Sequence, residues 1–201
     1  MTPDQQQSVA RGRQLQYFTV FYNCLEASVA LIAGTASGSI SLLGFGLDSL
    51  IEVTSGGAML LRLRDATFER AALRITGWCF ILLATYIALD SATMLWNHAE
   101  AAHSTAGIVV AAASVIVMPL LARAKRKVAA NLASNAMRVD SRQADFCAYL
   151  SAILLAGLAL NAALGWWWAD PAAALAMVPI IAREGINALK GQQCSDCGCH
   201  T

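Results

Sequence analysis

Six long apolar runs follow one another along this chain, separated by short polar stretches. A helix needs about 20 apolar residues to cross roughly 30 Å of hydrocarbon, and each run approaches or exceeds that length. Backbone groups cannot remain unpaired in lipid, so the runs predict helices rather than strands. We therefore expect an all-α, polytopic membrane protein with six transmembrane helices. The expected spans are Tyr17–Ala36, Ile40–Leu61, Arg74–Trp96, Ser104–Ala122, about Val139–Trp166, and Pro171 to about Leu189.

The distribution of charge supports the same topology. All 14 Lys and Arg residues fall on one side of a six-span chain, and the first, third and fifth connections contain none. Cytoplasmic loops carry an excess of these residues, so both termini are expected in the cytoplasm. The chain opens with a polar stretch, and its first apolar run is long enough to stay as a helix, which argues against a cleaved signal peptide.

Composition fits a membrane protein better than a soluble one. Apolar residues make up 57% of the 201 positions and charged residues only 13%, with a mean hydropathy of +0.53. The soluble segments are too short to bury a core of their own. We expect residues 1–189 to form one membrane domain and residues 190–201 a short cytoplasmic tail. The basic segment 123–142 either holds two helix ends together or faces solvent and lipid headgroups.

Two carboxylates, Asp48 and Glu52, interrupt the second apolar run. Acidic residues are costly within a membrane span and mark ion sites or polar paths by default. Their i, i+4 spacing places both on one face of a helix, where they would repel each other. A bound divalent cation relieves that repulsion, as would protons or an Arg from another helix. Since no expected span has an Arg near its centre, the pair predicts a cation site.

The fifth span offers two pairs of partner ligands at the same i, i+4 spacing. Gln143 and Cys147 share one face of the helix, and Asp145 points nearly opposite both. Ser141 and Asp145 form the competing pair. Spacing alone does not decide between these two pairs of ligands.

These features resemble the cation diffusion facilitator family of metal transporters across nearly all of residues 10–190. The resemblance lies in six spans with both ends inside, the segment Gly44-Phe-Gly-Leu-Asp-Ser-Leu-Ile-Glu52, and a basic connection leading into Val139-Asp-Ser. In that family, a D-x-x-x-D or H-x-x-x-D pair on the second helix and an H-x-x-x-D pair on the fifth form a tetrahedral site for zinc-like ions. Asp48 and Glu52 match the first pair, with Glu in place of the final Asp.

The fifth helix departs from the family pattern because it has no His. Aligning Asp140 with the leading Asp of the family motif places Gln143 at the His and Cys147 at the final Asp. The other alignment pairs Ser141 with Asp145. We prefer Gln143 and Cys147, since a thiolate binds transition metals better than a serine hydroxyl does. Such a site suits zinc, cadmium, cobalt, iron or manganese.

Two further acids, Glu26 and Asp90, fall within the first and third spans. As transport residues they would carry protons or guide the metal. Alternatively, they accept hydrogen bonds across helices from hydroxyls such as those of Ser28, Thr85 or Ser91. The sequence does not favour either of these two alternatives.

The end of the chain gathers four metal-binding side chains, which would remain reduced in the cytoplasm. Cys and His at this density can capture a soft or borderline metal ion without a fold, although such tracts can also be inert. Relatives in the family usually carry a soluble domain here, so we expect a short member without it, whose tail acts as a metal sensor or delivery arm. The four are Cys194, Cys197, Cys199 and His200.

The sequence therefore predicts a secondary transporter that exports a divalent, zinc-like cation from the cytoplasm in exchange for protons. We expect a multi-pass protein of the bacterial plasma (inner) membrane, with no permanently bound cofactor and no nucleic-acid partner. No G-x-x-x-x-G-K-[ST] motif for ATP is present. The resemblance implies a homodimer, for which Gly34, Gly38, Gly56 and Gly57 would allow close helix contacts.

Two other functions compete with transport. A membrane sensor or scaffold would keep the metal site and lack flux. A membrane thiol oxidoreductase would need cysteines in the outer connections, which contain none. We therefore expect no enzymatic activity.

Overall fold

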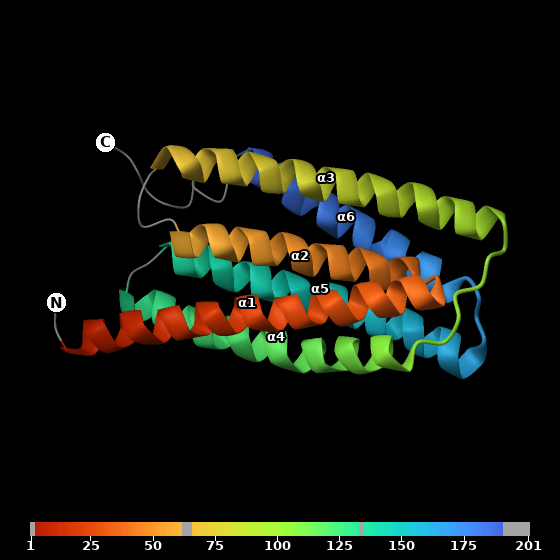
Figure 1. Ribbon diagram of the computed structural model, residues 1–201, viewed down its shortest axis with the longest axis horizontal. Coiled ribbons are helices and arrows are strands. Elements are labelled where there is room, and N and C mark those ends of the chain that lie inside the picture. Colours follow the sequence, from red (N-terminus) through yellow and green to blue (C-terminus); the bar gives the residue numbers. More distant parts are fainter. Residues whose placement is uncertain (1–2, 62–65, 133–134, 191–201) are drawn as a thin grey trace.

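The computed structural model describes residues 3–61, 66–132 and 135–190, and this part of the chain is all-α (Figure 1). Each expected span corresponds to one helix, and α2 has the bounds that the apolar run predicts. Several helices continue beyond the apolar runs, most of all α1, which includes the polar residues before Tyr17. The elements are α1 (Pro3–Ser37), α2 (Ile40–Leu61), α3 (Ala66–Trp96), α4 (Thr105–Leu132), α5 (Asn135–Leu164) and α6 (Ala169–Leu189).

By helix length and hydropathy, the chain is a multi-pass membrane protein. Within the described residues, α1, α3, α4, α5 and α6 each contain a stretch long and apolar enough to cross a membrane. The 22-residue helix α2 runs beside them in the same bundle (Figure 1). Five of the six predicted spans thus meet the length and hydropathy expected of a membrane helix.

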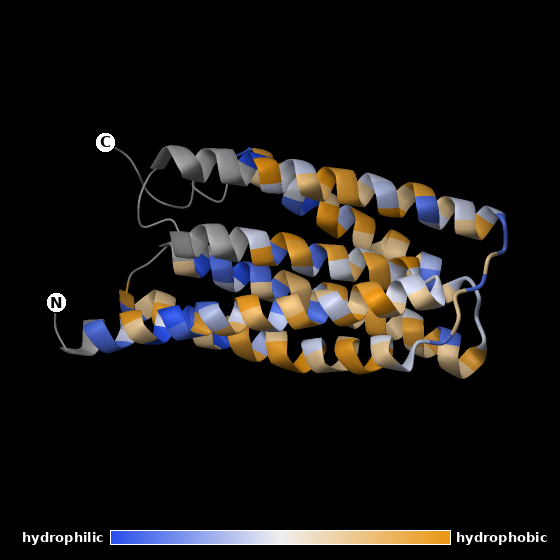
Figure 2. Cartoon of the chain, viewed as in Figure 1, coloured by the Kyte–Doolittle hydropathy of each residue, from blue (hydrophilic) through white to orange (hydrophobic). Residues whose placement is uncertain are grey.

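The start of α1 and the end of α6 lie at the same end of the bundle, which we call the terminal end (Figure 1). The helices alternate in direction, so the α1–α2, α3–α4 and α5–α6 connections lie at the opposite end. Hydrophilic residues of α1, α4 and α5 gather toward the terminal end, whereas the middle of the bundle is largely apolar (Figure 2).

The helices pack as a group of four and a pair. α1 packs on α2 and α4, α4 packs on α5, and α3 packs mainly on α6. Small residues allow the α3–α6 contact to be close: a Cβ on Gly185 would lie 3.0 Å from the Gly77 carbonyl oxygen. The pair joins the group of four through contacts of α2 and α5 with α6 and of α2 with α3.

The glycines expected at a dimer contact have other structural roles where they are described. Gly34 is buried within the bundle, where an added Cβ would lie 3.0 Å from Leu43 on α2. Gly38 has a φ of 67° and forms the turn between α1 and α2. The surroundings of Gly56 and Gly57 fall outside the part of the structure that is described. Gly34 and Gly38 therefore shape the α1–α2 hairpin and give no support for a dimer surface.

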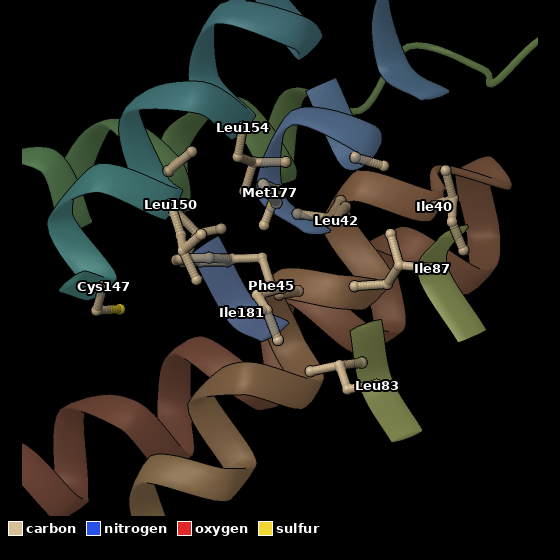
Figure 3. Packing of buried hydrophobic residues seen from close by; sticks show 14 of the residues in the cluster. Ile40, Leu42, Phe45, Leu83, Ile87, Cys147, Leu150, Leu154, Met177 and Ile181 are labelled. Carbon is tan, nitrogen blue, oxygen red and sulfur yellow. The ribbon is translucent and has the colours of Figure 1, made fainter. Parts of the chain in front are cut away.

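Most of the labelled apolar core lies in the half of the bundle away from the terminal end. Because α2 begins at the opposite end, its first buried apolar residues lie in that half, and Cys147 lies at the edge of the cluster (Figure 3). Helices α3, α5 and α6 contribute the rest of the labelled core. Its residues include Ile40, Leu42, Phe45, Leu83, Ile87, Leu150, Leu154, Met177 and Ile181.

Asp170, at the start of α6, ties the first turn of α2 to the bundle. Its buried carboxylate accepts hydrogen bonds from the Ser39 hydroxyl at 2.6 Å, the Ile40 backbone N–H at 3.0 Å and the Ser41 hydroxyl. The first N–H groups of a helix have no partner within it, so a carboxylate there supplies the missing acceptor. This contact fixes the first turn of α2, the helix that carries Asp48 and Glu52.

Replacing Asp170 with alanine is expected to lower the thermal stability of the detergent-solubilised protein. The change leaves buried donors without acceptors, each at a cost of about 1–3 kcal/mol. Thermal unfolding measures the loss. Asp170→Asn keeps one acceptor oxygen and should lose less. An unchanged unfolding temperature in Asp170→Ala would refute this role.

The basic segment 123–142 is mostly helical and joins α4 to α5. Lys125 forms a buried ion pair with Asp140 at 2.7 Å, and Arg126 pairs with Asp145. Of the two alternatives for this segment, holding helix ends together is the one observed. The helical pattern of α4 continues past its apolar run, because its buried face includes Leu121, Lys125 and Val128.

Candidate metal centre

Helices α2 and α5 bring two acids and a thiol together inside the bundle. Asp48 and Glu52 lie one turn apart on the face of α2 that points inward, and their exposed fractions are 0% and 4%. Cys147 of α5 is also 0% exposed. One ligand atom from each residue lies within 4.8 Å of the other two. Carboxylate oxygens and a thiolate at such separations suit a divalent transition-metal ion.

The Asp48 carboxylate has unmet hydrogen-bonding capacity. Within the described part of the chain, neither of its oxygens has a hydrogen-bond partner, although both are fully buried. Burying a carboxylate without a partner is costly, and buried charges are normally paired or bound to metal. A cation between Asp48, Glu52 and Cys147 would remove that cost.

Helix α1 contributes two polar side chains to the surroundings of this cluster. Asn23 donates a hydrogen bond from Nδ2 to Glu52 Oε2 at 2.6 Å. Glu26 accepts hydrogen bonds from the hydroxyls of Ser49 on α2, at 2.9 Å, and Ser114 on α4. The Cys147 sulfur lies 3.9 Å from Glu26 Oε2. Glu26 therefore lies directly beside the cluster and links three helices to it.

Glu26 accepts hydrogen bonds from hydroxyls across helices, as one alternative expected, but from Ser49 and Ser114. The hydroxyls named in advance were the wrong ones. Ser28 and Thr85 donate to backbone carbonyls of their own helices, those of Cys24 and Ile81. A Ser or Thr hydroxyl on a helix can always reach the carbonyl one turn earlier, so its sequence position does not identify a cross-helix partner.

Asp90 lies apart from the acid and thiol cluster. It is partly exposed on α3, and the Tyr86 hydroxyl one turn earlier lies near its carboxylate. Asp90 therefore differs from Asp48, which is fully buried. Among Glu26, Asp48, Glu52 and Asp90, Asp48 is the one with both carboxylate oxygens buried and without a hydrogen-bond partner in the described structure.

Cys147, rather than Asp145, faces the acids of α2. Asp145 is partly exposed and pairs with Arg126, and the Ser141 hydroxyl donates to the Arg138 carbonyl at 2.7 Å. Gln143, one turn before Cys147, is partly exposed. The geometry thus places one member of the preferred pair at the cluster and neither member of the competing pair.

Lys125 is a buried cation that the sequence analysis missed. It is 1% exposed and pairs with Asp140, and its charge also acts on the Glu52 carboxylate. A signal was present in the sequence, since Lys125 follows Leu121 and precedes Val128 at helical spacing, on the buried face of α4. Its place among other basic residues concealed that signal.

A pocket of about 630 Å³ lies between α5 and α6. One of its acids, Glu184, is close enough to Asp48 for the two carboxylates to repel each other. Glu184 is therefore the pocket residue that relates this part of the bundle to the cluster. Its lining residues are Arg142, Asp145, Phe146, Tyr149, Pro179, Ile180, Arg183, Glu184 and Asn187.

The four tail residues proposed as metal ligands, Cys194, Cys197, Cys199 and His200, lie outside the described residues. The structure therefore bears only on the site between the helices.

The chain was also compared with known proteins. It matches no family model, and no curated protein matches its sequence. The chemistry of the site thus rests on the residues and their geometry.

Proposed function

We propose that this chain is a secondary transporter for a divalent transition-metal cation, with Asp48, Glu52 and Cys147 as ligands. The observation that carries the proposal is the buried cluster of two acids and a thiol, drawn from two helices of a multi-pass bundle. Acids are retained within membrane helices mainly where they bind an ion or line its path. The resemblance to cation diffusion facilitators supports the same function.

The ligand types indicate the class of metal. Oxygen ligands alone favour magnesium, calcium or manganese, whereas a thiolate favours zinc and softer ions. A site of mixed oxygen and sulfur ligands suits zinc, cadmium, cobalt or iron. We propose zinc as the reference substrate.

The packing on either side of the cluster favours loading from the terminal end. Most of the labelled apolar core lies on the opposite side, while Glu184 and the α5–α6 pocket lie toward the terminal half. In the proposed topology all six helices cross the membrane, and both termini are cytoplasmic. Metal would then enter from the cytoplasm, and rocking of helix pairs would open the site to the other side.

Proton exchange follows from competition for the same ligand atoms. Metal ligands must lose their protons to bind, so metal and protons exclude each other at the cluster. Protons arriving from outside would release the metal, and metal from the cytoplasm would displace the protons. We further propose a homodimer in the plasma membrane, from the family resemblance.

Transport is tested with purified protein in liposomes that contain a pH dye. External zinc should enter the liposomes while protons leave them, and a zinc gradient should drive proton movement without ATP. Zinc binding without flux would favour the rival function of a sensor or scaffold. Absence of both binding and flux would reject the metal centre itself.

The tail must be separated from the helix site in every metal measurement. We define a tail-substituted protein as the full chain with its four tail ligands replaced by Ser or Ala. If the helix site is the transport site, this protein should retain zinc flux. The changes are Cys194→Ser, Cys197→Ser, Cys199→Ser and His200→Ala.

A further inference from the structure

We propose that Asn23, on α1, supplies the fourth metal ligand through its side-chain oxygen Oδ1. This inference rests on the proposed metal centre and adds a ligand from a third helix. It differs from the expectation that both pairs of ligands come from α2 and α5.

The position of Asn23 is fixed by its contact with Glu52. Its side chain is 0% exposed, and its Nδ2 donates to Glu52 Oε2 at 2.6 Å. An ionised carboxylate only accepts hydrogen bonds, so the nitrogen of the amide must face Glu52. Oδ1 is attached to the same carbon as Nδ2 and therefore lies close to the Glu52 carboxylate.

The Oδ1 atom has no hydrogen-bond partner within the described part of the chain. A buried amide oxygen without a partner loses its hydration and gains nothing in return, at a cost of about 1–3 kcal/mol. Asp48 has the same unmet capacity in both carboxylate oxygens. A single cation between them would satisfy the unpaired atoms of both residues.

Other nearby side chains are less suited to this position. Ser49 and Ser114 already donate to the two oxygens of Glu26, and Asp145 pairs with Arg126. Gln143 is partly exposed, whereas the three clustered ligands are buried. Asn23 combines full burial, an unpaired oxygen and direct contact with a ligand.

Charge also favours a neutral fourth ligand. Asp48, Glu52 and a Cys147 thiolate together supply three negative charges, already more than a divalent ion neutralises. An amide oxygen completes four-coordination, which zinc prefers, without adding a fourth charge. Meanwhile Nδ2 holds Glu52 in place, as residues around metal ligands commonly do.

The test is a cobalt(II) titration of the tail-substituted protein, followed by visible absorption. Four-coordinate cobalt absorbs strongly in the visible range, whereas higher coordination with added water absorbs weakly. The variants are Asn23→Leu, which removes both polar atoms, and Asn23→Asp, which keeps an oxygen ligand and loses the donor to Glu52. Asn161→Leu is the control, because Asn161 is a buried Asn bonded to the Ala101 carbonyl.

If Asn23 is a ligand, Asn23→Leu should weaken cobalt binding by about 100-fold or more, at or above the upper end for residues that merely support a ligand. Its visible bands should also fall. Asn23→Asp should keep tight binding and strong bands, and Asn161→Leu should behave as the wild type. Retained binding in Asn23→Asp excludes a role for Asn23 only as the donor to Glu52, even if Asn23→Leu fails to fold.

Two results would overturn the inference while leaving the metal centre intact. In one, both Asn23 variants weaken binding equally and keep the wild-type bands, as expected if Asn23 only orients Glu52. In the other, Asn23→Leu binds cobalt as the wild type does. If the wild type itself shows no thiolate-to-cobalt charge-transfer band, the proposed metal centre fails first.

Discussion

Replacing Asp48 with asparagine is expected to abolish zinc transport and to weaken zinc binding by at least about 100-fold. Asp48 is fully buried, and neither of its oxygens has a hydrogen-bond partner in the described structure. The substitution keeps the size of the side chain but removes its charge and replaces one oxygen with a donor group. Zinc affinity in detergent and zinc flux into liposomes measure the two effects.

Asp90→Asn is the matched control for this prediction. Asp90 is also an acid within an expected membrane span, but it is partly exposed and is not part of the cluster. It should keep zinc binding and most of the flux. Equal losses in the two variants would show only that these helices tolerate no change of charge. Flux that survives in Asp48→Asn would contradict the proposed site.

Replacing Cys147 with alanine is expected to have the second largest effect, with zinc affinity reduced by about 100-fold or more. The change removes the only sulfur in the cluster of described residues. Residual binding should shift away from cadmium and toward manganese, since oxygen ligands favour harder ions. Competition between the three metals in the tail-substituted protein measures this shift.

Asp145→Asn tests the competing pair of ligands. Asp145 pairs with Arg126, and both side chains are partly exposed, so loss of the pair should cost about 0–1 kcal/mol at most. Metal binding should survive. Cys24→Ala, at an exposed cysteine, controls for general effects of removing a thiol. Loss in Asp145→Asn with retention in Cys147→Ala would instead support Ser141 and Asp145.

The helices and the ligand pair on α2 could be predicted because their signals are local. Apolar runs of membrane length show where helices form, and α2 has the bounds of its run. Asp48 and Glu52 needed only the i, i+4 rule. Cys147 could be placed at the same site from its spacing, its ligand chemistry and the family resemblance.

The contacts that α1 and α4 make with the cluster could not be predicted in the same way, although Glu26 itself stood out as an acid within a span. Which face of a helix meets a given neighbour depends on its rotation and crossing angle, and a span that is apolar on all sides gives little indication of either. Asn23, Glu26 and Lys125 reach the cluster through those packing angles. Their partners, such as Ser114, lie far away in the sequence.

The most direct test of the metal centre is zinc X-ray absorption on the tail-substituted protein loaded with a single zinc ion per chain. The proposed site predicts one sulfur at about 2.3 Å from zinc and oxygen ligands at about 2.0–2.2 Å, with the sulfur absent in Cys147→Ala. A zinc ion with no sulfur neighbour, or a spectrum that the Cys147→Ala substitution leaves unchanged, would contradict the account.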